Sequence, residues 1–202
     1  MIVYLHIPHT CGRSVKRALF VKDEIKKITW VHNSSQIQNI SNLEEEKILY
    51  LVLRNPIERI IGEFKHYSRN LLSIGIVNHL ELSHILKNNK KFDAKNIIDY
   101  CSLEVNRNVC CKFLLLRCDF NVPVSESDYD ILLNTEFKFD VYSFPLKLPI
   151  LSDLLGFEIA PHVVVDNVNK NDVSEQEKVK IIKLNEYDIR LYNYLNKHQS
   201  IN

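Results

Sequence analysis

Residues 48–59 read ILYLVLRNPIER, and this stretch decides the fold that the sequence predicts. Its first half, residues 48–53, is apolar at every position. A continuous apolar run, in contrast to an alternating one, is typical of a parallel strand that is buried on both faces. The run ends at Arg54, and residues 57–68 follow with apolar side chains at helical spacing. A buried strand that passes into a helix indicates an α/β unit.

The chain before this stretch has the same organisation. Residues 1–7 are an apolar run bounded by Pro8, which predicts a buried strand. A helical pattern follows at 14–20, and a second short strand is expected at 27–32. Strands that alternate with helices in this way predict an α/β fold with three layers, in which helices flank a central parallel β-sheet.

The rest of the chain is predicted to be mostly helical. Gly156 can end a helix, because glycine adopts the left-handed backbone of the position after a helix without strain. Ser174 and Glu177 form a capping box, which begins the last helix or helix pair. The expected elements are a helical turn at 34–40, helices at 103–116, 150–155 and 174–197, and a strand at 139–144.

The bulk composition fits one globular domain that covers residues 1–202. The chain is 46% hydrophobic, and its formal net charge of +1 gives no strong field that would draw it to nucleic acid or to an anionic membrane. No signal peptide and no membrane-spanning apolar run is visible. The five cysteines are an odd number without CxxC spacing. We therefore expect a cytoplasmic protein with reduced, buried thiols and no zinc site.

Two loops follow strands of this predicted sheet. Ligands of open α/β sheets bind beyond the carboxyl ends of the strands, where residues 6–14 (HIPHTCGRS) and residues 54–59 (RNPIER) are expected. Backbone N–H groups of the first loop, together with the N-terminus of the helix that follows, can hold an anion. Arg54 can place two N–H donors on a phosphate. The sequence therefore predicts an anion site between the two loops.

The start of the first helix also bears on this site. Arg13, Lys16 and Arg17 crowd its first turn. Positive charge at this end opposes the helix dipole unless an anion binds, although such side chains can also point into solvent. The ATP-binding pattern GxxxxGK(S/T) fits poorly, because it needs glycine and lysine where the chain has Ile7 and Arg13.

Taken together, the two loops resemble those of the sulfotransferases that use 3′-phosphoadenosine 5′-phosphosulfate (PAPS), in particular the branch that includes the carbohydrate sulfotransferases. That family has a loop of the form HIPKTGGTS on the 5′-phosphosulfate and a motif of the form RNPxxRxxSxY on the 3′-phosphate. The corresponding segments here are HIPHTCGRS at 6–14 and RNPIERIIGEF at 54–64. The resemblance implies the P-loop NTPase-like fold of the sulfotransferases.

The resemblance continues through most of the chain in the same order. VHNSSQIQNI at 31–40 is similar to the segment in which many relatives place a histidine base. NRNVCCKFLL at 106–115 resembles the family's asparagine-containing helix. PHVVVDNVNK at 161–170 and NEYDIRLYNYL at 185–195 resemble its C-terminal pattern and closing helix.

The resemblance implies a site for the sulfuryl donor, PAPS. Arg59 would assist at the 3′-phosphate or pair with Glu63. The implied donor-binding residues are Thr10, Cys11, Gly12, Arg13 and Ser14 for the 5′-phosphosulfate, Arg54, Arg59 and Gly62 for the 3′-phosphate, and Asn169 and Lys170 beside the nucleotide.

Four positions depart from the family pattern. His9 replaces the lysine that contacts the transferred sulfuryl group, Cys11 replaces a glycine, and Arg13 replaces a threonine. Gly62 stands where the family has a serine. We assign the permanent positive charge to Arg13. We expect His9 to donate a proton to the leaving group if a bound anion holds up its pKa.

His32 is the expected general base, because an imidazole can accept the proton of an acceptor hydroxyl near neutral pH. The implied reaction moves a sulfuryl group from PAPS to a hydroxyl or amine, without a metal, and the family branch favours a carbohydrate acceptor. One alternative is a P-loop-type nucleotide kinase, which needs a magnesium-binding Asp at a strand end. Another is a non-catalytic member of the fold that binds a nucleotide or glycan, and the replacements at His9 and Gly62 favour it.

Overall fold

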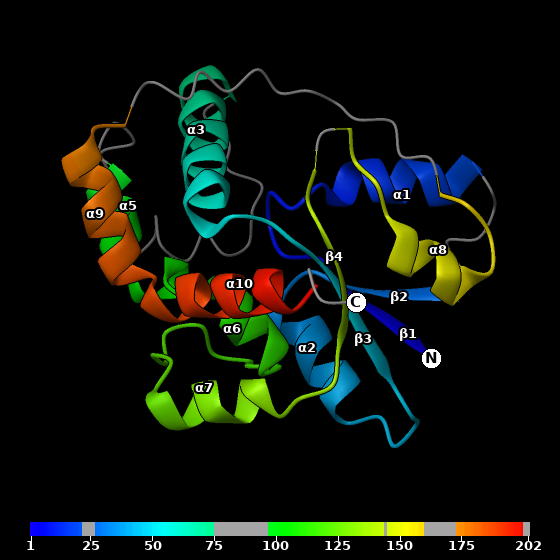
Figure 1. Ribbon diagram of the computed structural model, residues 1–202. Coiled ribbons are helices and arrows are strands. Elements are labelled where there is room, and N and C mark those ends of the chain that lie inside the picture. Colours follow the sequence, from blue (N-terminus) through cyan, green and yellow to red (C-terminus); the bar gives the residue numbers. More distant parts are fainter. Residues whose placement is uncertain (22–26, 75–96, 144, 160–172, 200–202) are drawn as a thin grey trace.

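The fold is built on a parallel β-sheet (Figure 1). The computed structural model describes residues 1–21, 27–74, 97–143, 145–159 and 173–199. In these residues four parallel strands lie in the order β2-β1-β3-β4. They are β1 (Ile2–Leu5), β2 (Ile28–Val31), β3 (Ile48–Leu53) and β4 (Lys138–Val141). The predicted α/β class and parallel sheet are confirmed.

One face of the sheet is covered by α1 (Gly12–Val21) and α8 (Pro149–Leu155) (Figure 1). Tyr4 and Tyr50 are register partners on β1 and β3, and both are buried in the core on this face. Val15 and Leu19 of α1 pack against them, and burying each of these side chains contributes about 1.5–3 kcal/mol. The spacing of apolar residues along α1 thus fixes this helix, and the loop before it, on the sheet.

The opposite face carries the larger core cluster. Val3 and Leu5 of β1 point to this face because side chains alternate along a strand. The helices that contribute buried side chains to this cluster are α2 (Ser34–Ser41), α6 (Val109–Leu114), α7 (Glu126–Leu133) and α10 (Glu186–Gln199). Helices on both faces give the three layers that the sequence predicts.

A third, smaller cluster lies beyond the carboxyl end of β3. There α3 (Pro56–Ile74) packs against α5 (Ile97–Ser102) and α9 (Glu175–Leu184) (Figure 1). Ile60 and Ile61 of α3 are its buried contribution. This packing fixes the direction in which α3 leaves the sheet, and so places the side chains of its first turns beside the loop after β1.

Several predicted boundaries are confirmed. The strand at 48–53 is β3. Gly156 follows α8 with φ of 76°, in the left-handed region. Ser174 and Glu177 form the capping box of α9, and a second helix, α10, follows it.

The helix predicted at 103–116 is wrong as a single element. It divides into a 3₁₀ turn, η2 (Glu104–Asn106), and α6, because Asn108 between them has φ of 47°. Asn108 accepts a hydrogen bond from the backbone N–H of Asp188 through its side-chain oxygen. The Asp188 carboxylate in turn accepts the N–H groups of Cys110 and Cys111 at 3.0 and 2.9 Å. Contacts with α10, distant in sequence, therefore set the start of α6.

The cysteines and helices give two further findings. Cys101, Cys110 and Cys111 are buried, as predicted for small apolar side chains, whereas Cys118 is exposed. Among the described residues no group of three His, Cys, Asp or Glu side chains is placed to hold a metal ion. None of the described helices is both long and apolar enough to cross a membrane.

Candidate anion site

The loop between β1 and α1 has an unusual backbone. His9 and Cys11 have φ of 63° and 62°, a left-handed conformation that costs a residue with a side chain about 1 kcal/mol or more. The carbonyl oxygen of Cys11 accepts the N–H groups of Ser14 and Val15, which starts α1. Strained backbone of this kind persists where the surrounding contacts hold it, and it concentrates at binding sites.

Two backbone N–H groups of this loop are available to a ligand. Those of Cys11 and Gly12 have no hydrogen-bond acceptor among the described residues. By contrast, the N–H of Thr10 and its hydroxyl both donate to the carbonyl oxygen of Ile7, at 3.3 and 2.7 Å. Thr10 therefore holds the loop in shape, and Cys11 and Gly12 are the better donors for an anion at the N-terminus of α1.

Gly12 lies against the imidazole of His6. A Cβ atom at Gly12 would stand 1.8 Å from Nε2 and 2.0 Å from Cδ2 of His6, so the ring would have to move. The His6 ring also stacks on His32, with ring centroids 4.6 Å apart. The missing side chain at Gly12 thus lets the loop lie against His6.

We expect Gly12→Ala to lower the free energy of unfolding by about 1–3 kcal/mol, because the added methyl group forces the His6 ring out of its place. Gly62→Ala is the matched control, since a Cβ there meets only Nη1 of Arg54 at 3.7 Å, and alanine favours a helix. Urea denaturation measures both. An equal loss of stability in the two variants would contradict the role of the close contact at Gly12.

Arg54 joins the two predicted loops. Its Nη1 donates to the carbonyl oxygen of His9 at 2.9 Å, and its guanidinium lies over the Tyr142 ring at 4.8 Å. Nε of Arg54 is buried and has no hydrogen-bond partner within the described part of the chain. The Arg54 side chain is 20% exposed, and its Nε lies 3.9 Å from Oε2 of Glu58. Arg54 therefore supports the first loop from the second and keeps donor capacity on its own guanidinium.

Arg59 is not placed as the sequence suggests for a ligand contact. It is 2% exposed, and its Nη1 donates to Glu63 at 2.7 Å, so the pairing alternative is the correct one. Burial alone would lower its pKa, but Glu63 and Asp188 raise it, and the guanidinium stays charged. Arg59 adjoins a narrow cavity of about 10 Å³, room for roughly one water molecule. Arg59 is therefore a buried residue whose charge acts on the loop, and it is not placed to contact a ligand.

His9 lies among positive charges. The centroids of its ring and of the His66 ring on α3 lie 5.0 Å apart, and His66 was not predicted as a site residue. Burial lowers the pKa of His9 to about 3, with further lowering by His66 and by Arg59, Arg54 and Arg13. The His9 imidazole is therefore neutral at physiological pH while no anion is bound. The three arginine charges that disfavour its protonation would also attract an anion.

His32 lies at the carboxyl end of β2, beside this loop. Its backbone N–H donates to Oε1 of Gln36 at 2.6 Å, and its Nδ1 lies 3.4 Å from the carbonyl oxygen of His6. His6 separates His32 from Gly12. The His6 ring thus lies between His32, the predicted base, and the loop that would hold the leaving group. The His32 side chain is half-buried.

The remaining predicted residues fall into three groups. Ser14 is buried in the first turn of α1, whereas the Arg13 side chain is exposed. Burial raises the pKa of the Cys11 thiol to about 12, so this thiol stays protonated. Asn169 and Lys170 lie outside the described residues.

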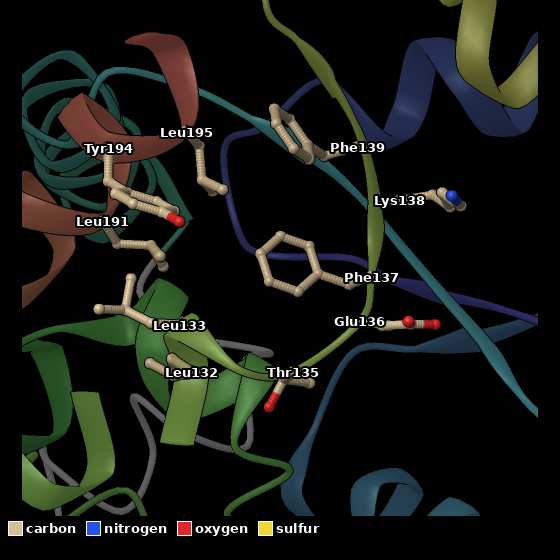
Figure 2. Close-up of a pocket in the computed structure, with 10 residues that line it drawn as sticks. All are labelled: Leu132, Leu133, Thr135, Glu136, Phe137, Lys138, Phe139, Leu191, Tyr194 and Leu195. Carbon is tan, nitrogen blue, oxygen red and sulfur yellow. The ribbon is translucent and has the colours of Figure 1, made fainter. Parts of the chain in front are cut away.

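A larger concave feature lies elsewhere, between β4 and α10 (Figure 2). Its volume is about 350 Å³. Phe137 and Phe139 point toward Leu191, Tyr194 and Leu195 of α10 across it. None of the predicted site residues that the structure describes lines this groove, so the candidate site remains at the ends of β1 and β3.

Comparison of the chain with protein-family models and with curated proteins gave no match. The resemblance to the sulfotransferases therefore rests on the sequence motifs.

Proposed function

We propose that the chain binds PAPS beyond the carboxyl ends of β1 and β3 and transfers its sulfuryl group to a hydroxyl or amine of an acceptor. The observation that carries this proposal is the hydrogen bond from Arg54 Nη1 to the His9 carbonyl oxygen, at 2.9 Å. It fixes the two loops side by side, as the two phosphate groups of one nucleotide require. The resemblance of the loops favours a carbohydrate as the acceptor.

The 5′-phosphosulfate would lie at the N-terminus of α1. The N–H groups of Cys11 and Gly12, which have no acceptor in the described part of the chain, would donate to it, and the exposed Arg13 would add positive charge. The 3′-phosphate would lie nearer Arg54, whose guanidinium is partly exposed. Gly62 leaves room on this side of α3, because even an added Cβ would be 3.7 Å from Arg54 Nη1.

In the proposed reaction an acceptor oxygen attacks the sulfur atom in line with the bridging oxygen. The new bond joins the acceptor oxygen to sulfur, and the bond from sulfur to the bridging oxygen breaks. The electron pair of that bond stays on the 5′-phosphate, where the loop N–H groups and nearby cations stabilise it. His32 would take the proton of the acceptor hydroxyl, which typically accelerates such a step roughly 10²–10⁴-fold.

A second candidate is a nucleotide-binding protein of this fold without turnover. It is favoured by His9, which is neutral at physiological pH where the family has a charged lysine. A nucleotide kinase has less support. Asp140, the acidic residue within the four described strands, accepts hydrogen bonds from the Tyr50 hydroxyl and from the N–H groups of Ile150 and Leu151. Its oxygens thus cap α8.

A transfer assay separates these functions. The protein is incubated with PAPS and a panel of mono- and disaccharides, and mass spectrometry follows the sulfated product and the nucleotide released. The proposal expects release that depends on the acceptor. Nucleotide binding without product on any acceptor would favour the non-catalytic candidate, and magnesium-dependent transfer of phosphate from ATP would favour the kinase.

A further inference from the structure

We propose that His9 and His66 form a two-imidazole element that takes up one proton when an anion binds the loop after β1, and so supplies the positive charge of the missing lysine. This inference rests on the proposed function, because it concerns the same 5′-phosphosulfate position. It adds His66 to the site and gives the site a dependence on pH.

The geometry places His66 on the face of α3 that meets the loop. Arg59, Gly62 and His66 are three and four residues apart, and this spacing aligns side chains on one helix face. A Cβ added at Gly62 would meet only Nη1 of Arg54, at 3.7 Å. The rings of His9 and His66 have centroids 5.0 Å apart and planes at 58°. His9 itself has a left-handed backbone, with φ of 63°.

Charged or titratable groups face His9 from each element that packs around it. His66 and Arg59 approach from α3, Arg54 from the end of β3, and Arg13 from α1. The nearby acidic groups are engaged by two of these arginines. Glu63 binds Arg59 at 2.7 Å, and Glu58 lies 3.9 Å from Arg54.

An anion bound among these groups changes which form of the imidazole is favoured, from the neutral form to the protonated form. Without it, burial and the surrounding cations hold the pKa of His9 at about 3. A bound phosphosulfate places negative charge against the imidazoles, which favours the protonated form and raises the pKa of the pair. A group whose pKa rises on binding takes up a proton, so affinity increases as pH falls through the window between the free and bound pKa values. One linked proton changes affinity by up to about tenfold per pH unit.

The probe for this linkage is adenosine 5′-phosphosulfate, because its phosphosulfate keeps the same charge between about pH 6 and about pH 8. Calorimetry in two buffers of different ionisation enthalpy counts the protons taken up. For the unmodified chain we expect close to one proton at about pH 6, and an affinity roughly tenfold or more higher than at about pH 8.

Three variants locate the proton. His9→Gln/His66→Gln should bind weakly with no proton uptake, and His9→Lys should bind equally well at both pH values. His32→Gln should keep the uptake, because His32 stacks on His6 outside the pair. Circular dichroism confirms that each variant is folded. Uptake that persists in the double variant, or that vanishes with His32→Gln, overturns the assignment.

The two proposals fail in different ways. If 3′-phosphoadenosine 5′-phosphate binds but the affinity for adenosine 5′-phosphosulfate is flat with pH, the imidazole pair is wrong and the donor site stands. If neither nucleotide binds, both are wrong.

Discussion

Arg54→Ala is expected to weaken the binding of 3′-phosphoadenosine 5′-phosphate by about 10²-fold or more. The change removes a charged donor from the 3′-phosphate, and charge-assisted hydrogen bonds contribute about 1.5–3 kcal/mol. It also removes the hydrogen bond to the His9 carbonyl oxygen, which holds the other anion loop in place. Binding of the 3′-phosphate and binding of the 5′-phosphate are therefore both weakened, and calorimetry measures the loss of affinity.

Two controls accompany this variant. Arg54→Lys keeps the charge but loses the planar fork, so its affinity should lie between those of the alanine variant and the unmodified chain. Arg190→Ala removes the same charge from α10, where Arg190 binds Glu126 through both terminal nitrogens, and should leave affinity unchanged. If Arg54→Ala binds the nucleotide as well as the unmodified chain, the position of the donor site is wrong.

His32→Ala is expected to reduce the turnover of PAPS by about 10²–10⁴-fold while nucleotide binding changes less than about twofold. The imidazole accepts the acceptor's proton as the new bond forms, so its loss acts on the rate. His32 contacts His6 and Gln36, and neither of these residues is expected to contact the nucleotide. Initial rates with saturating acceptor, together with calorimetry, separate the two effects.

His32→Gln provides the matched control for packing. Glutamine fills part of the same space and can form hydrogen bonds, but it cannot act as a base near neutral pH. The account expects it to be as slow as the alanine variant. Turnover restored by glutamine would assign His32 a positioning role and would leave the general base to be found elsewhere.

The sequence predicts the sheet and the two loops because their signals are local. A continuous apolar run marks β3, and its transition into RNP marks the point where the chain leaves the sheet. β1 lies next to β3 in the sheet. Loops at the carboxyl ends of parallel strands lie at the same edge of a sheet, which is why the sequence predicts a site between them. That β1 and β3 are neighbours, and that Arg54 contacts His9, comes from the structure.

The errors arise where distant segments decide the structure. The helix expected at 103–116 breaks because Asn108 is bonded to Asp188 on α10, about 80 residues along the chain. A further helix, α7, was not predicted, although Ser125 and Asp128 form a capping box in the sequence that could have identified it.

The positions of two site residues also depend on tertiary packing that the sequence does not predict. The sequence left open whether Arg59 faces a ligand or pairs with Glu63, because the packing of α3 against α5 and α9 decides its burial. His66 lies two residues beyond the RNPIERIIGEF segment, and only the direction of α3 brings it to His9. The sequence predicts which residues share one face of a helix. Which segment packs against that face depends on the tertiary structure.

The most direct test of the central claim is calorimetric titration of the protein with 3′-phosphoadenosine 5′-phosphate, compared with adenosine 5′-phosphate. The first nucleotide can engage both loops, and the second lacks the phosphate assigned to Arg54. The account predicts binding of the bisphosphate at least about tenfold tighter than that of the monophosphate, with the difference abolished in Arg54→Ala. Equal affinity for the two nucleotides, or no binding of either, would contradict it.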